Sequence, residues 1–333
     1  MTRRTSIGGV ALALAIGLAA LGTAGRGEAA DPIKLRFAHT LSTEDTSHKA
    51  IVEFAKWVKE RTSGGVEIEI YPAAQLGNDP KVIEGIRLGT IDMGMTGNPF
   101  FTSFAPELNV LDLPYLFRDY EHAYKVLDGP LGRDLQAVVE KHNLKGIGFL
   151  EIGFRNLTNG KRPVKTAADV KGLKLRVVPN PAHVLAWKLL GAIPTPMPFP
   201  EVYLALKTGT VDGQENPVTI IYPNKLHEVQ KYLSLTWHAY TAFDVVVNLK
   251  KHQGLPPDAQ KVLVDALREA FVWQRKLNRE VEGGYLEKMR AAGVVIEAEP
   301  DRESFRKVVA AEVSEDYVKK FGPDLLQKIR QLR

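Results

Sequence analysis

The chain has 333 residues, a formal net charge of +5 and no cysteine. This length suits two domains of ordinary size, and the lack of cysteine excludes disulfides, thiolate nucleophiles and cysteine-ligated metals. The 44 basic residues are interspersed with 39 acidic ones and form no basic stripe, which argues against nucleic-acid binding.

Residues 1–29 have the pattern of a signal peptide. Two arginines at positions 3 and 4 precede an apolar run at 7–21, and small residues follow. A run of about 15 residues is short of the roughly 20 that a membrane-spanning helix needs. We therefore expect export to the periplasm by the general or the twin-arginine route, with cleavage after Ala24 or Ala29. We expect the mature protein not to span the membrane.

The first half of the mature chain alternates strand and helix patterns. Apolar residues recur at helical spacing along 51–58, and the pair Asp79-Pro80 opens a second helix that Gly89 closes. The strands are expected at Ile33–Ala38, Val66–Ile70 and Ile91–Met95. This β-α-β-α-β order predicts an α/β layer with a parallel sheet.

The alternation resumes after Gly146. Further strands are expected at Ile147–Ile152, Leu173–Val178 and Val245–Leu249, a helix at Glu201–Lys207, and a long helix at Pro257–Ala292 that is weakened at Gly283-Gly284. These elements predict two α/β lobes, with the chain crossing between them near residues 152 and 241. The expected ranges are 30–152 plus 241–280 for lobe I and 153–240 plus 281–333 for lobe II. A ligand would bind between the lobes.

Several motifs resemble one known family. They are residues 172–177 (GLKLRV), 194–197 (PTPM) and 201–217 (EVYLALKTGTVDGQENP), with support from 71–77, 113–118 and 127–132. Together they resemble the DctP family, the extracytoplasmic solute receptors of tripartite ATP-independent periplasmic (TRAP) transporters. The resemblance extends over nearly the whole mature chain.

The resemblance implies a two-lobe periplasmic binding protein of the type II-like class, with hinge strands and a long C-terminal connecting helix. Such receptors close over a small organic acid, such as a C4-dicarboxylate, sugar acid or hydroxy acid, and deliver it to a small and a large membrane subunit. By the same resemblance, Arg176 pairs with the ligand carboxylate, Arg155 and Asn216 assist, and Phe199 packs on the ligand.

These residue types suit such a site on chemical grounds as well. The planar guanidinium of arginine matches a carboxylate with two parallel hydrogen bonds, and an asparagine amide both donates and accepts. Each residue also has an ordinary structural alternative. Arg176 and Arg155 could form salt bridges, Asn216 could belong to a turn, and Phe199 could belong to the core.

Six further residues are weaker candidates for ligand contact. Asp79 and Asn180 could instead cap helices, and Trp237 could belong to the core. The candidates are His39, Thr40, Asp79, Asn98, Asn180 and Trp237.

An enzyme is not expected. The chain lacks a nucleophile elbow, a phosphate-binding loop and a dinucleotide fingerprint, and no histidine follows His227-Glu228 at zinc-binding spacing. No cofactor or metal is predicted. The alternative within binding proteins is a carboxylate receptor of an ABC transporter or of a sensor kinase.

Overall fold

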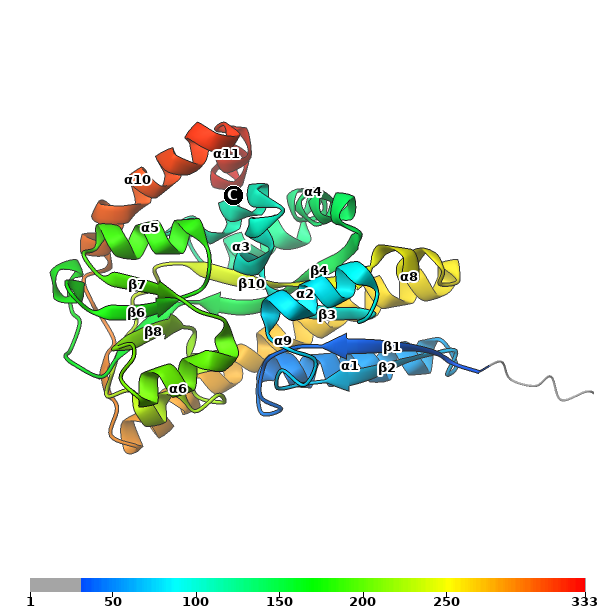
Figure 1. Ribbon diagram of the computed structural model, residues 1–333, viewed down its shortest axis with the longest axis horizontal. Coiled ribbons are helices and arrows are strands. Elements are labelled where there is room, and N and C mark those ends of the chain that lie inside the picture. Colours follow the sequence, from blue (N-terminus) through cyan, green and yellow to red (C-terminus); the bar gives the residue numbers. More distant parts are fainter. Residues whose placement is uncertain (1–30, 333) are drawn as a thin grey trace, which may run out of the picture. The chain divides into compact units, whose positions relative to one another are not determined.

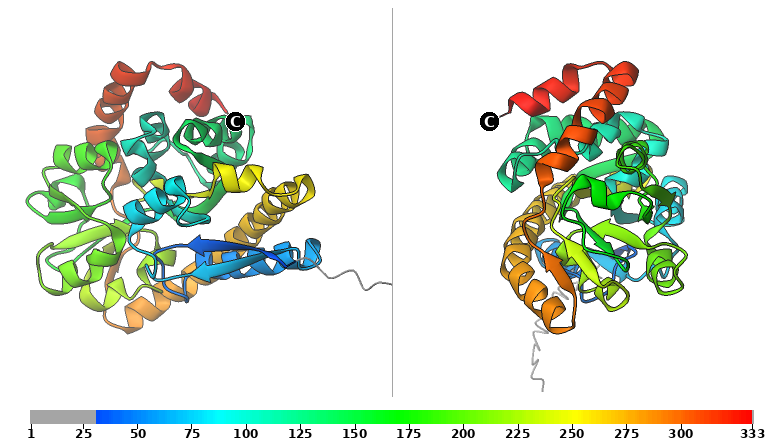
Figure 2. Two further views of the ribbon diagram at one scale, coloured as in Figure 1. Left: turned by 45° about the vertical axis from the view of Figure 1, so that its right-hand side comes forward. Right: turned by 90° about the vertical axis from the view of Figure 1, so that its left-hand side faces the viewer.

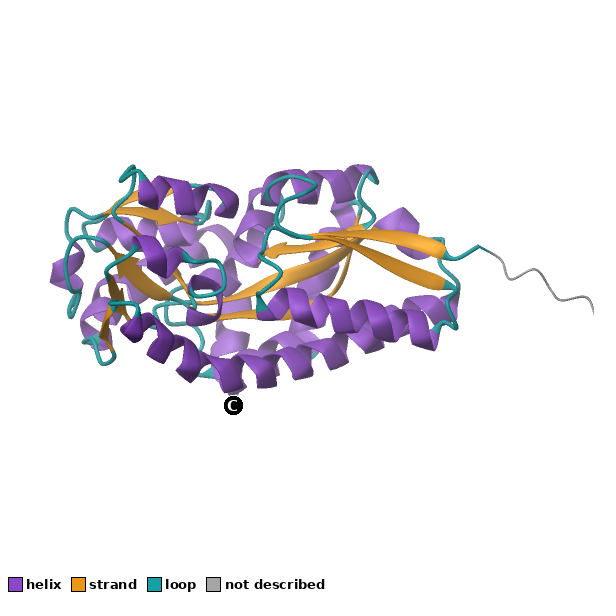
Figure 3. Ribbon diagram, turned by 90° about the horizontal axis from the view of Figure 1, so that it is seen from below, coloured by secondary structure: helices purple, strands orange, loops and turns teal. Residues whose placement is uncertain are grey.

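The computed structural model describes residues 31–332, so the predicted signal peptide lies outside the described residues. These residues form two mixed β-sheets flanked by helices (Figures 1 and 3). The α/β class and the long helix near the C-terminus are thereby confirmed. The exact residue ranges of the two lobes stay a prediction.

Sheet A has the strand order β2-β1-β3-β10-β4. Its strands are β1 (Ile33–Ala38), β2 (Val66–Tyr71), β3 (Met93–Gly97), β4 (Leu144–Phe154) and β10 (Tyr240–Asn248). The first three are parallel to one another, but β10 lies between β3 and β4 and is antiparallel to both. The parallel arrangement predicted from the first three strands is therefore confirmed, and the sheet as a whole is mixed because β10, from much later in the chain, enters it in the opposite direction.

Sheet B has the order β11-β9-β5-β8-β6-β7. Its strands are β5 (Asn156–Asn159), β6 (Lys174–Val177), β7 (Ile193–Pro196), β8 (Gly213–Asn216), β9 (Tyr232–Ser234) and β11 (Val295–Glu297). The chain passes from sheet A to sheet B at Arg155, between β4 and β5, and returns between β9 and β10. Both passages lie within a few residues of the crossings predicted at 152 and 241.

Helices cover both sheets and connect their strands. They are α1 (Thr46–Arg61), α2 (Asp79–Leu88), α3 (Tyr120–Asp128), α4 (Pro130–Ala137), α5 (Pro181–Leu189), α6 (Val202–Lys207), α7 (Val218–Ile221), α8 (Leu249–Gln253), α9 (Pro257–Ala291), α10 (Arg302–Phe321) and α11 (Asp324–Gln331). Short 3₁₀ turns include η1 (Asn98–Ser103), η2 (Pro106–Asp112) and η5 (Phe199–Glu201).

The long helix α9 contacts elements associated with both sheets. It packs against α1 and β4 on the side of sheet A and against α7, which follows β8 of sheet B (Figure 2). It runs unbroken through Gly283 and Gly284, so the predicted weak point does not interrupt it. At about 1.5 Å per residue, its 35 residues extend over about 52 Å.

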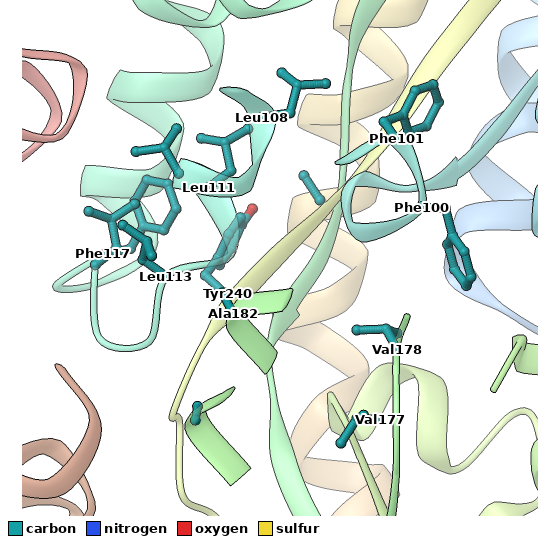
Figure 4. Close-up of a cluster of buried hydrophobic side chains, with 14 of the residues drawn as sticks. Phe100, Phe101, Leu108, Leu111, Leu113, Phe117, Val177, Val178, Ala182 and Tyr240 are labelled. Atoms are coloured by element: carbon teal, nitrogen blue, oxygen red, sulfur yellow. The ribbon is translucent and has the colours of Figure 1, made fainter. Parts of the chain in front are cut away.

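The hydrophobic core is shared between the sheets rather than confined to one. One cluster joins β1, η1, η2 and α3 to residues of β6 and α5, and Figure 4 shows Phe100, Phe117 and Tyr240 in it, with Val177 and Val178 at the end of β6. A second cluster lies between sheet A, α1 and α9, and a third lies below sheet B. The first cluster brings the end of β6 close to the end of β3, where the cavity described next is located.

Candidate ligand cavity

A cavity lies where strand ends of the two sheets meet. Sheet A contributes Thr40 after β1 and Thr241 of β10, and sheet B contributes Arg176 of β6 and Asn216 of β8. Six of the predicted ligand residues line it, namely Thr40, Asp79, Arg155, Arg176, Phe199 and Asn216.

Arg176 is a fully buried cation on the cavity wall. Its side chain is 0% exposed, and its Nε and Nη2 donate to the Met197 carbonyl oxygen at 2.9 and 2.7 Å. Its Nη1 has no hydrogen-bond partner, and the side chain forms no salt bridge with residues 31–332. Burial lowers the pKa of Arg176 to about 10, against the opposing charge of Glu215, so it remains charged at neutral pH. A buried guanidinium with an unpartnered nitrogen requires an anion or another acceptor.

Arg155 is also buried, but it is already paired. Its Nε donates to Glu215 Oε2 and its Nη2 donates to Glu215 Oε1 at 3.0 Å, and the two side chains are 1% and 0% exposed. The predicted salt-bridge alternative for Arg155 is therefore real, although the residue also lines the cavity.

Glu215 is held by more than Arg155. The Nε2 of His238 lies 3.0 Å from Glu215 Oε2, and the Nδ1 of His238 lies 2.8 Å from the Thr236 hydroxyl. Burial alone would raise the pKa of Glu215, but the charge of Arg155 and the His238 hydrogen bond outweigh burial and hold the pKa well below its usual value. Arg155 is thus fixed in place by an ionised, fully buried carboxylate.

Asp79 is the first residue of α2 and not its cap. Asn78 caps the helix by accepting from the Lys81 backbone N–H, so the capping alternative for Asp79 is wrong. The Asp79 side chain is nine-tenths or more buried, and its Oδ1 accepts from the Thr40 hydroxyl at 3.2 Å. Its Oδ2 has no hydrogen-bond partner among the described residues. Burial raises the pKa of Asp79 to about 6, opposed by the Thr40 hydrogen bond and the charge of Arg176.

Phe199 and Asn216 complete the predicted part of the wall. Phe199 begins the turn η5 and packs against the second and third hydrophobic clusters. Asn216 is the last residue of β8, and its Nδ2 donates to Gln214 Oε1 at 2.6 Å. Phe199 therefore does both things that the sequence left open. It packs against core residues, and it lines the cavity.

His39 and Asn98 are buried but do not line the cavity. His39 accepts from the Leu41 N–H, and its Nε2 lies 3.0 Å from His48 Nδ1. Asn98 donates through Nδ2 to the Leu108 carbonyl oxygen and to Asp112 Oδ2. Both side chains turn toward neighbouring backbone and core groups instead of the strand ends.

Asn180 and Trp237 also lie away from the cavity wall. Asn180 caps α5 by accepting from the N–H groups of Ala182 and His183, so its structural alternative is the one observed. Trp237 is half-buried, packs against the first hydrophobic cluster and stacks on Phe154 at a ring-centroid distance of 4.9 Å.

One polar residue of the wall on sheet A was not predicted from the sequence. Thr241 of β10 lines the cavity, and its buried hydroxyl has no partner. Most of the remaining wall is apolar, with Pro99, Phe100, Ile152, Ile220 and Phe243. The sequence offered one signal for Thr241. The chain was predicted to cross between the lobes near residue 241, and strand ends meet at such a crossing.

Two searches of residues 31–332 bear on other kinds of site. No group of three or more His, Asp or Glu side chains in this range could hold a metal ion. No helix in it is long and apolar enough to cross a membrane.

The chain is similar to several known binding proteins. It is 42% identical to the 2,3-diketo-L-gulonate-binding periplasmic protein YiaO of Escherichia coli over 90% of this chain and 92% of the relative. It is 33% identical to the C4-dicarboxylate-binding periplasmic protein DctP of Rhodobacter capsulatus over 88% of this chain and 86% of the relative.

A solved structure has the same fold. It is a TRAP periplasmic solute-binding protein from Polaromonas sp. JS666 bound to D-erythronate, with a TM-score of 0.88 and 36% identity over 90% of this chain and 99% of that one. The family model for bacterial extracellular solute-binding proteins, family 7, matches residues 37–320. The chain therefore belongs to the DctP family of TRAP solute-binding proteins, as its motifs indicated.

Proposed function

We propose that this protein is the periplasmic receptor of a TRAP transporter and binds a small organic acid by its carboxylate through Arg176. The observation that carries the proposal is the buried Arg176 on the cavity wall, whose Nη1 is unpartnered and which forms no salt bridge within residues 31–332. An ionised carboxylate supplies both the charge and the acceptor that this group needs. Arg155 and Asn216 would orient the acid, and Phe199 would pack on it.

Binding requires the cavity to open, because almost all wall side chains are buried. Asn224, which follows α7, connects the two sides of the mouth. Its Oδ1 accepts from the Ser42 N–H and its Nδ2 donates to Asp45 Oδ2, each at 3.1 Å. Under this proposal the contacts break when the lobes separate and re-form when they close over the acid.

The receptor would then deliver the acid to the small and the large membrane subunit. Transport into proteoliposomes that contain both subunits, driven by a sodium gradient and dependent on this protein, would support that step. Uptake that instead requires ATP and an ATPase subunit would favour an ABC-type receptor.

The test of the site is calorimetric titration of Arg176→Ala with the tightest acid from a thermal-shift screen, which detects ligands that stabilise the native state. Loss of the cationic partner of a buried carboxylate costs about 2–5 kcal/mol of binding free energy, at least a thirtyfold loss of affinity. Arg61→Ala is the control, because Arg61 pairs with Glu269 at the surface. A loss under tenfold for Arg176→Ala would contradict the proposed role.

A further inference from the structure

The cavity presents an anionic group as well as a cationic one. Asp79 and Arg176 both line it, and they form no salt bridge with each other. The two side chains therefore belong to one wall lining but lie more than 4.0 Å apart. A ligand that occupies the cavity can contact a cation and a carboxylate.

The Asp79 carboxylate requires a hydrogen-bond donor. Its Oδ1 accepts from Thr40, and its Oδ2 is buried without a hydrogen-bond partner among residues 31–332, although the backbone N–H groups of Asp79 and Phe199 lie near the carboxylate. An ionised carboxylate can only accept hydrogen bonds, and a buried acceptor without a partner costs about 1–3 kcal/mol. The remaining polar wall group on sheet A, the Thr241 hydroxyl, is also unpartnered.

These two groups distinguish between classes of organic acid. A hydroxyl group of the ligand can donate to Asp79 Oδ2, and a neighbouring hydroxyl can pair with Thr241. A second carboxylate has no proton to donate at neutral pH, and the negative charge of Asp79 would repel it. An unsubstituted alkyl chain would leave both polar groups unpaired.

We infer that the cavity selects hydroxylated monocarboxylates of the aldonate type, whose hydroxyl donates to Asp79 while the carboxylate binds Arg176, and that it rejects dicarboxylates. This inference rests on the proposed function and narrows its ligand class. Asp79 is then the residue that sets specificity, and Arg176 sets only the requirement for a carboxylate.

The experiment compares acids of matched length by calorimetry at pH 7.5. The four-carbon set is D-erythronate, L-threonate, succinate and butyrate, and the six-carbon set is D-galactonate, D-gluconate and adipate. We expect the tightest aldonate to bind at least a hundredfold more strongly than the dicarboxylate of its own set and than butyrate. A dicarboxylate within threefold of the tightest aldonate overturns the inference, and this result needs no variant protein.

Asp79→Asn then tests the residue itself. The asparagine keeps an acceptor oxygen but loses the charge and gains an N–H donor, so we expect at least a tenfold loss for the aldonate and equal or tighter binding of the dicarboxylate. Asp128→Asn, which removes a half-exposed charge outside the cavity, should change neither affinity. Equal losses for both acids with Asp79→Asn would overturn the specificity role.

Failure of the proposed function has a different signature. In that case none of the seven acids binds the wild-type protein, or Arg176→Ala binds the tightest acid as well as wild type does. Failure of the specificity inference alone leaves tight, Arg176-dependent binding with no preference for hydroxylated acids.

Discussion

Arg155 and Glu215 form an ion pair that is buried on both sides, with exposed fractions of 1% and 0%. Arg176, on the same cavity wall, is equally buried and forms no salt bridge with any carboxylate of the described residues, 31–332. The two arginines therefore differ in their ion pairing, although the sequence alone does not distinguish them. Arg155 is balanced by the protein's own charge, and Arg176 is the cation whose balance a ligand would provide.

Glu215→Gln should destabilise the ligand-free protein. The substitution leaves the buried charge of Arg155 without its counter-ion, which costs about 3 kcal/mol of unfolding free energy. Chemical denaturation followed by circular dichroism measures the change. The matched control is Glu269→Gln, since Glu269 pairs with Arg61 at the surface and should lose less than about 1 kcal/mol. Equal losses of unfolding free energy in the two variants would show that burial does not increase the contribution of the Arg155–Glu215 pair to stability.

Asn224→Ala should weaken ligand binding without changing the cavity wall. It removes the hydrogen bonds to Ser42 and Asp45 that join the two sides of the mouth, and each is worth about 1 kcal/mol to the closed form. We expect a five- to thirtyfold loss of affinity by calorimetry. Tyr203→Phe is the control, because it removes a hydroxyl near the mouth that bonds only to Glu228 at 3.3 Å, and its affinity should match wild type.

His39 should make stability fall as the solution is acidified. Burial, with the nearby His48 charge, lowers the pKa of His39 from 6.5 to about 3. Below pH 6.5 the unfolded chain therefore protonates His39, whereas the folded protein protonates it only near pH 3. Protonation of the unfolded chain lowers the free energy of unfolding, so the protein has its full stability only above pH 6.5. Between pH 7 and 5 this residue should remove about 2 kcal/mol of stability.

The measurement is urea denaturation at both pH values for wild type and His39→Gln. The variant is expected to lose about 2 kcal/mol less than wild type over this interval, whatever its stability at pH 7. Parallel pH dependence in the two proteins would mean that other groups carry the effect.

Thr241→Val should separate stability from binding. Its buried hydroxyl has no partner, so replacing it with a methyl group should leave the unfolding free energy of the ligand-free protein unchanged or raise it by up to about 1 kcal/mol. Affinity for a hydroxylated acid should fall about fivefold. Thr158→Val is the comparison, because Thr158 donates to Gln230 and accepts from Gln214 and should be destabilised. If Thr241→Val and Thr158→Val lost the same unfolding free energy, the claim that only the Thr158 hydroxyl stabilises the ligand-free protein would be contradicted.

The local elements could be predicted from the sequence because their signals are local. The strand at Ile33–Ala38 and the start of α9 at Pro257 agree with the structure. The antiparallel entry of β10 could not be predicted, since strand order depends on contacts between residues more than a hundred positions apart. The helix cap was misplaced by one residue, because Asn78 and Asp79 are both good capping residues.

The position of a residue on the cavity wall could be predicted where a family motif contains that residue. It could not be predicted where the residue was chosen only because it follows a strand. Arg176 and Asn216, which the motif fixes, lie on the cavity wall, and their contact with a ligand stays a prediction. His39 and Thr40 are adjacent after the same strand, yet only Thr40 faces the cavity, because successive side chains point to opposite sides. The ion-pair partner of Arg155 could not be predicted from the sequence either, since Glu215 lies 60 positions away.

The burial of the cavity wall has a kinetic consequence. Under the proposed function, an acid against Arg176, Asp79 and Phe100 is surrounded by buried side chains, and the contacts of Asn224 hinder its escape while they persist. Its residence time would then be the waiting time for the protein to open, nearly the same for tight and loose ligands of similar shape. If the protein serves a TRAP transporter as proposed, the membrane subunits need only change that waiting time, without competing for the hydrogen bonds that hold the acid.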